Sequence, residues 1–225
     1  MSSETEEKPL DIAETFSKTE VFIEKNKKTL SIVAGALVVL VGGYFGYKKF
    51  ILEPQEKEAQ SQMFVAERYF EMDSLKLAAT GDGNYLGFEE IIKQYGITKA
   101  ANLAHYYLGI CYLKTGAFEK AIETLKAYSG EDEITAPLAT GAIGDACMEL
   151  NRTDEAISYY LKAANQRDNE FTTPVFLMKA GLACEGAGKY KDAISAYERI
   201  HAAYAASAEG KDIDRFIARA KVQAK

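Results

Sequence analysis

The chain has 225 residues, of which 48% are apolar and 27% charged, a balance typical of a folded globular protein rather than a disordered one. Its net charge of −6 and the lack of a long basic run argue against nucleic acid as a partner. Three widely spaced cysteines, Cys111, Cys147 and Cys184, form neither a disulfide framework nor a zinc-ligand pattern. Only four prolines occur, so the composition favours helices.

The N-terminal part contains one strongly apolar segment. Residues 1–28 form a polar, acidic tail, which we expect to be short and partly disordered. The following run from Thr29 to Tyr47 has no charged residue. As a helix it spans roughly 28 Å at about 1.5 Å per residue, close to the hydrocarbon thickness of a bilayer. Lysines flank the run on both sides, and the sequence therefore predicts a transmembrane helix over 29–50.

Two alternatives to a permanent anchor are a buried core helix and a cleaved signal peptide. The run is too uniformly apolar for a core helix, and no small-residue cleavage site closes it as in a signal peptide. Charge does not fix the orientation, because residues 9–28 carry four lysines and residues 48–67 carry three.

Small residues lie near one face of the predicted membrane helix: Ser31, Gly35, Gly42 and Gly46. Gly42 and Gly46 form a small-xxx-small pair, which permits close helix contact in lipid. Glycine is also common in membrane helices without such a contact. A partner helix in the membrane, or self-association, is therefore a hypothesis.

The rest of the chain shows internal repetition. Three glycines, 35 and 37 residues apart, each precede an alanine by 12 residues, namely Gly109 and Ala121, Gly144 and Ala156, Gly181 and Ala193. This pattern resembles the tetratricopeptide repeat, a helical hairpin of about 34 residues. The resemblance implies three such repeats over 102–206, with the small residues at the contact between the two helices of each hairpin. His105, Thr140 and Leu177 stand where the family carries tryptophan.

Less regular segments flank the three repeats. Residues 51–101 contain a juxtamembrane helix, with Pro54 as a candidate kink, and a degenerate first repeat. In the segment 207–225, apolar residues at helical spacing predict a capping helix for the open end of the solenoid. The predicted fold class is all-α: a single N-terminal transmembrane helix, a tetratricopeptide-repeat α-solenoid and a C-terminal capping helix.

The predicted function is protein binding. The sequence contains no recognisable arrangement of catalytic residues, metal-ligand pattern or cofactor motif, so an enzyme is not expected. The three cysteines are interpreted as small apolar residues of the core. The family lines its groove with the first helix of each repeat, which implies a mainly apolar peptide groove. When the family's groove positions are transferred to the matching positions of this sequence, the groove residues are Leu103, Tyr106, Ile110, Leu113, Leu138, Asp145, Met148, Val175, Met178 and Leu182, with Gly141 and Glu185 beside them.

The order of parts resembles the YfgM-type tetratricopeptide proteins of bacterial inner membranes. The matching pieces are EKNKKTLSIVAGALVVLVGGYFGYKKF and the repeat cores. The resemblance implies a single-pass inner-membrane protein with its N-terminus in the cytoplasm and its repeats in the periplasm. It also implies an adaptor that links exported proteins or periplasmic chaperones to the Sec translocon. A structural subunit of an envelope complex and a cytosol-facing receptor of the import type remain alternatives.

Overall fold

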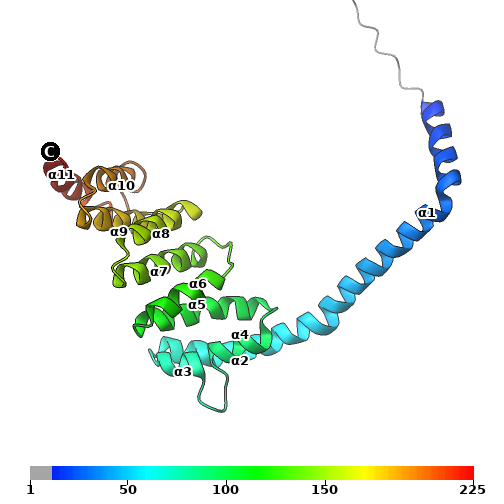
Figure 1. Cartoon of the computed structure of the whole chain (residues 1–225), viewed down its shortest axis with the longest axis horizontal. Coiled ribbons are helices and arrows are strands. Elements are labelled where there is room, and N and C mark those ends of the chain that lie inside the picture. The colour runs from blue at the N-terminus through cyan, green and yellow to red at the C-terminus, as the bar shows by residue number, and fades with distance from the viewer. Residues whose placement is uncertain (1–11) are drawn as a thin grey trace, which may run out of the picture. The chain divides into compact units, whose positions relative to one another are not determined.

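The computed structural model describes residues 12–225, with side chains from Glu20 onward (Figure 1). Within that range the protein is all-α and contains no β-strand, which confirms the predicted fold class. The chain divides into two compact units, residues 1–53 and 54–225. The first part of the predicted polar tail, residues 1–11, lies outside the described residues.

The described part of the first unit is one long helix. α1 (Ile12–Tyr47) begins well before Thr29 and runs into η1, a π-helical turn (Lys48–Leu52). The helical stretch Glu20–Glu71 contains one segment that is long and apolar enough to cross a membrane, and no residue of that segment is buried by the rest of the chain. Val38 and Val39, for example, are 72% and 73% exposed.

Pro54 does not interrupt the helix. Proline has no amide hydrogen, and its ring clashes with the carbonyl four residues earlier, so an ordinary α-turn is unfavourable here. The chain instead widens into the π-turn, where the amide of Glu53 donates to the carbonyl of Lys48. The helix then continues as α2 (Glu53–Glu71), in place of the kink suggested by the sequence.

The second unit begins with an irregular repeat. α2 is followed by α3 (Leu75–Thr80) and α4 (Phe88–Tyr95), so the first helix of this repeat is broken in two. Ala59, Met63 and Ala66 of α2 are buried in one apolar cluster with residues of α3, α4 and α5 (Lys99–Lys114). Glu56 of α2 also accepts hydrogen bonds from the first two amides of α5, at 2.7 and 3.2 Å, which caps that helix.

Three regular hairpins follow and stack one on the next (Figure 1). They are α5 with α6 (Phe118–Ala127), α7 (Thr135–Glu149) with α8 (Thr153–Gln166), and α9 (Thr173–Gly186) with α10 (Tyr190–Ala203). Each hairpin turns at a residue with positive φ: Gly116, Asn151 or Gly188. The next amide donates back to the helix, as Lys189 does to Cys184 at 2.8 Å, which is the Schellman arrangement that glycine and asparagine favour.

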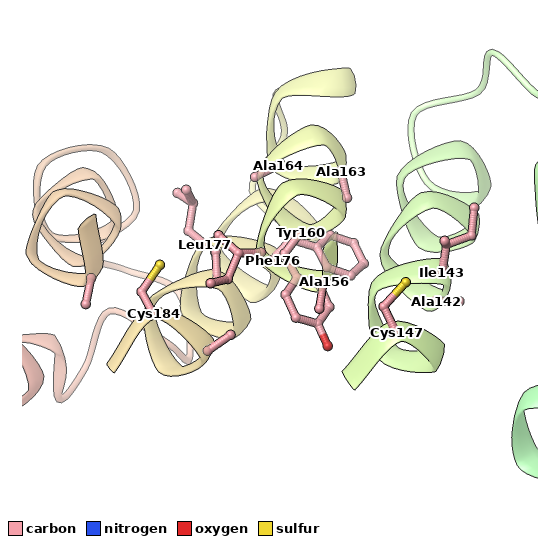
Figure 2. Packing of buried hydrophobic residues seen from close by; sticks show 14 of the residues in the cluster. Ala142, Ile143, Cys147, Ala156, Tyr160, Ala163, Ala164, Phe176, Leu177 and Cys184 are labelled. Atoms are coloured by element: carbon pink, nitrogen blue, oxygen red, sulfur yellow. The ribbon is translucent and has the colours of Figure 1, made fainter. Parts of the chain in front are cut away.

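The repeated glycines lie where the two helices of a hairpin cross. A Cβ atom added to Gly144 would lie 2.7 Å from the Tyr160 ring, and one added to Gly181 would lie 2.2 Å from the Tyr197 ring. These large residues, four positions after each repeated alanine, therefore lie over the glycine of their own hairpin. The alanine one turn earlier is completely buried in all three hairpins. Figure 2 shows Ala156 beside Tyr160.

The last helix covers the end of the stack. α11 (Ile213–Gln223) packs against α10 and buries Ile213 and Ala220. The ring of Phe216 lies 5.6 Å from the ring of Tyr197. This helix supplies the apolar cover that a further repeat would give, and it carries the capping role predicted for the C-terminal segment.

We expect Gly181→Ala to lower the free energy of unfolding by about 1–3 kcal/mol, because the new methyl group overlaps the buried ring of Tyr197. Urea unfolding of the detergent-solubilised chain, followed by circular dichroism, measures the change. Gly186→Ala is the matched control in the same helix, since its added Cβ meets no atom within 4 Å. Equal stability of the two variants would contradict the proposed close contact.

Candidate protein-binding groove

The first helices of the three regular hairpins share a partly exposed face. All ten predicted groove residues lie on it, and none is fully buried: Leu103, Tyr106, Ile110 and Leu113 on α5, Leu138, Asp145 and Met148 on α7, and Val175, Met178 and Leu182 on α9. Met148 and Leu182 are the most exposed, at 36% and 44%. Gly141, by contrast, is buried, because the ring of Phe176 from α9 packs onto it.

Two adjoining clefts lie at the C-terminal ends of these helices. One has a volume of about 510 Å³ and is lined by Leu113, Lys114, Gly116, Phe118, Asp145, Met148, Glu149 and Tyr160. The other has a volume of about 380 Å³ and is lined by Met148, Thr153, Tyr160, Lys179, Leu182, Ala183 and Gly186. Because Met148 and Tyr160 line both, the clefts form one surface, which we call the groove.

The structure therefore brings four of the predicted residues into the groove: Leu113, Asp145, Met148 and Leu182. Leu103 lines a separate cleft of about 350 Å³ between α2 and α5, together with the exposed ring of Phe64. Tyr106, Ile110, Leu138 and Met178 pack against the core, and Val175 is half-buried. Tyr106 also meets the ring of Tyr128 at 5.9 Å.

A polar cluster forms the floor between the two clefts. Asp145 accepts a hydrogen bond from the hydroxyl of Tyr160 at 2.7 Å, and Lys179 Nζ lies 2.8 Å from each of its carboxylate oxygens. The Lys179 ammonium also lies over the rings of Tyr160 and Phe176, at 5.7 and 5.8 Å. Burial and then the Asp145 charge raise the pKa of Tyr160, so its hydroxyl stays protonated and donates. Asp145 therefore ties α7, α8 and α9 together.

The same arrangement recurs in the next hairpin. Glu185 of α9 accepts from the hydroxyl of Tyr197 at 2.9 Å and from Arg219 of α11 at 3.1 and 2.5 Å. The guanidinium of Arg219 lies 4.9 Å from the centre of the Phe216 ring. The hydrogen bonds from Arg219, and next that from Tyr197, lower the pKa of the Glu185 carboxyl against the opposing effect of burial.

The sequence analysis missed Phe118, Thr153, Tyr160 and Lys179 as groove residues. A signal for Lys179 was present, because it follows Asp145 by 34 residues, the length of one repeat. Arg219 follows Glu185 by the same interval. Opposite charges at the repeat spacing therefore mark contacts between neighbouring hairpins in this chain.

The cysteines lie in the core, as predicted. Cys111, Cys147 and Cys184 are all buried, unpaired thiols. Burial raises the pKa of each, that of Cys111 to about 12, so the thiolate form that nucleophilic or metal chemistry requires is disfavoured. Among the described residues, no group of three or more His, Cys, Asp or Glu side chains is placed to hold a metal ion.

Stacked helical hairpins with an open groove define a repeat scaffold of the kind that binds other proteins. The sequence profile of the tetratricopeptide repeat matches residues 88–133 and 142–208, half of the chain, and this protein belongs to the tetratricopeptide repeat family. It is thus a protein-interaction scaffold, and no enzyme family is indicated.

Solved structures support the fold. The TPR-like repeats of a putative kinesin light chain from Podosopora anserina superpose with a TM-score of 0.57 at 14% identity, covering 75% of this chain and 88% of that one. A second structure, of a substituted form of the same repeats, gives the same TM-score of 0.57 at 15% identity, with 75% and 87% covered. A comparison with curated protein sequences finds no significant match.

We expect acid to weaken the α9–α11 contact through Glu185. Because its folded-state pKa lies below the unfolded value of about 4.5, its stabilising effect is present above that value and is lost as the pH falls through the folded pKa. Glu185→Gln should therefore show a shallower loss of stability between about pH 5 and about pH 3 in urea unfolding. Glu198→Gln, which removes an exposed partner of Lys221 on α11, is the matched control. Identical pH profiles for wild type and Glu185→Gln would exclude this linkage.

Proposed function

We propose that this protein is a membrane-anchored adaptor that holds partner polypeptides in the groove. The observation that carries the proposal is the pair of adjoining clefts with Met148 at their junction and Leu182 beside it, both accessible and apolar. Methionine and leucine adapt to many apolar side chains, which suits a helix or an extended segment of a partner. The Asp145–Lys179 pair offers a fixed polar point in the floor, to which a bound backbone can be aligned.

The anchor in this proposal is the apolar part of α1. Its side chains have no cover within the described chain, whereas lipid would cover them on all sides. The lysines at both ends of the apolar run would lie in the polar headgroup regions on the two sides of the bilayer. Tethering the groove to a bilayer raises the local concentration of any membrane-associated partner.

The predicted helix contact through Ser31, Gly35, Gly42 and Gly46 stays part of the proposal. A Cβ added to Gly35, Gly42 or Gly46 meets no atom within 4 Å, so this surface is open to another membrane helix. The candidate partners are a translocon helix or a second copy of this chain.

The location in the proposal rests on the resemblance to YfgM-type proteins. It places the chain in a bacterial inner membrane, with the repeats in the periplasm, where the groove would receive exported proteins or chaperones beside the Sec translocon. The charges flanking α1 do not select this orientation. Protease protection of a C-terminal tag distinguishes it from the receptor alternative: in spheroplasts the tag should be digested, whereas a protected tag would place the repeats in the cytoplasm.

For the groove, we expect a photo-crosslinking amino acid at position 148 to form adducts with partner proteins in native membranes. One at position 161 should form none, because Leu161 is equally exposed, at 37%, but lies on the outer helix α8. Adding Leu182→Glu should reduce the adducts from position 148 by about tenfold, as expected for a charge introduced at the centre of an interface. Adducts of equal yield at both positions, unaffected by Leu182→Glu, would refute the groove.

For the anchor, we expect the full chain to stay with membranes after alkaline extraction. The double variant Val39→Arg, Leu40→Arg should move to the soluble fraction, because each charge at the bilayer centre costs about 2.5–3.5 kcal/mol. Phe64→Arg, which alters a residue of α2 that is 61% exposed, is the control and should remain in the pellet. Membrane retention of the double variant would argue against a spanning helix.

A further inference from the structure

Exposed apolar side chains recur at the starts of the first helices. Ile97, Ile134 and Phe171 are spaced by 37 residues each, and a threonine follows each of them. They are 54%, 41% and 76% exposed. Single exposed apolar residues are ordinary on protein surfaces, but a set at equivalent places, just before the first helices of successive hairpins, is not a random scatter. We call these three residues the edge row.

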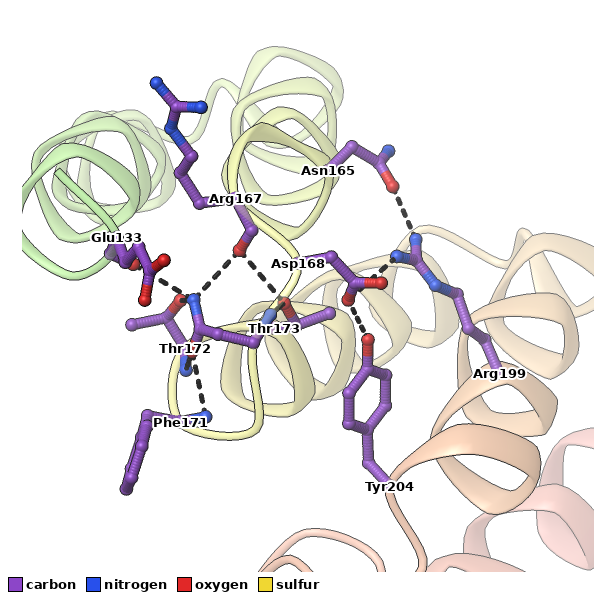
Figure 3. Close-up of polar contacts among 10 residues, drawn as sticks. Glu133, Asn165, Arg167, Asp168, Phe171, Thr172, Thr173, Arg199 and Tyr204 are labelled. Atoms are coloured by element: carbon purple, nitrogen blue, oxygen red, sulfur yellow. Dashed lines mark hydrogen bonds and ion pairs between the residues drawn. The ribbon is translucent and has the colours of Figure 1, made fainter. Parts of the chain in front are cut away.

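Helix capping does not explain the exposed ring of Phe171. An apolar residue just before the N-cap often packs onto the fourth residue of the helix, as a hydrophobic staple. Phe171 precedes the N-cap Thr172 of α9, and the staple partner would be Phe176. Phe176 is only 2% exposed, whereas Phe171 is 76% exposed, so Phe171 is not buried by such a contact. Figure 3 shows its ring pointing away from the helices.

The loop that carries Phe171 is held by hydrogen bonds. Asn169 Oδ1 accepts from the amides of Phe171 and Thr172, at 2.9 and 2.7 Å. Its Nδ2 donates to the carbonyl of Glu133 in the preceding loop, at 3.0 Å (Figure 3). This bond joins the residues next to Ile134 to the turn that positions Phe171. The amide of Asn169 itself donates to the hydroxyl of Thr173, at 3.1 Å.

The two joined loops are acidic. Glu131 and Glu133 precede Ile134, and Glu170 precedes Phe171; all three are exposed. Two further acids in these loops have structural partners, since Asp132 accepts from the Tyr128 hydroxyl at 3.0 Å and Asp168 accepts from the Tyr204 hydroxyl. The segments 128–134 and 167–172 contain a single basic residue, Arg167. Within the edge row, Ile134 and Phe171 are therefore set among exposed carboxylates.

We propose that the edge row is a second docking surface, which binds a cationic amphipathic segment of a protein partner. Apolar residues of such a segment would cover Phe171 and Ile134, while its lysines or arginines meet Glu131, Glu133 and Glu170. The carboxylates disfavour an anionic lipid surface, and they also disfavour a second copy of the same edge. The edge row is distinct from the groove, because the two lie at opposite ends of the first helices, roughly 20 Å apart at about 1.5 Å per residue.

The test uses the full chain in phosphatidylcholine nanodiscs and a fluorescent synthetic helix of alternating Leu and Lys pairs, followed by anisotropy. Empty nanodiscs set the background, and the same peptide with Glu in place of Lys tests the charge requirement. We expect the Lys peptide to bind, with an affinity that falls as salt rises, and the Glu peptide to stay at background.

Four variants separate the edge row from other surfaces. The single variant Phe171→Ser should weaken binding of the Lys peptide by about tenfold, and so should the double variant Glu131→Lys, Glu133→Lys. Phe64→Ser removes another exposed aromatic residue and should bind as the wild type does. The groove variant Met148→Glu, Leu182→Glu should also bind normally, so failure of the groove proposal and failure of this one give different results.

The proposal is overturned by any of four results: binding of the Glu peptide as strongly as the Lys peptide, unchanged affinity of both edge variants, loss of binding only in the groove variant, or association of two copies of the chain through this edge. All substituted side chains are exposed, so circular dichroism should report the wild-type helix content in every variant. Association of two copies through this edge would be seen, without added peptide, as a change in the number of chains per nanodisc. Phe171→Ser would abolish that change.

Discussion

The solenoid depends on one contact in each hairpin, a large side chain of the second helix lying on a glycine of the first. Burying such a side chain contributes about 1.5–3 kcal/mol, and only glycine leaves room for it at the crossing. In the first regular hairpin the large residue is Leu125, which needs no polar partner. In the next two it is tyrosine, whose buried hydroxyl must be paired.

The two tyrosines account for the charged clusters around Asp145 and Glu185. Tyr160 donates to Asp145 and Tyr197 donates to Glu185, so each hairpin acquires a carboxylate beside its core. A half-buried carboxylate is costly without a cation, and the next element provides one at an interval of 34 residues. The hairpin with Leu125 has Ile110 and Leu113 at the positions of these acids. Polar contacts between repeats thus follow from packing within repeats.

The two proposed docking surfaces arise from the same periodic stack. The groove forms at the turns within hairpins, where Met148 and Leu182 lie between successive first helices. The edge row forms at the connections between hairpins, where Asn169 links one loop to the loop before it. A solenoid has two such sides by construction, because every hairpin turn lies at one end of its helices and every connection at the other. One scaffold can therefore hold two partners of different chemistry.

The sequence by itself determined the helical class, the three regular hairpins and the glycines at which their helices cross, because these depend on local periodicity and on small residues at fixed intervals. It also identified the apolar segment of α1, since length and the absence of charge can be counted along the chain. Tertiary structure decided which of the ten groove residues line the clefts. Ile110 and Met178 are partly buried because they pack against the apolar core, which several hairpins build together. The engagement of Asp145 by Lys179 and the outward position of Phe171 were decided there too, because each depends on atoms that only the fold brings together.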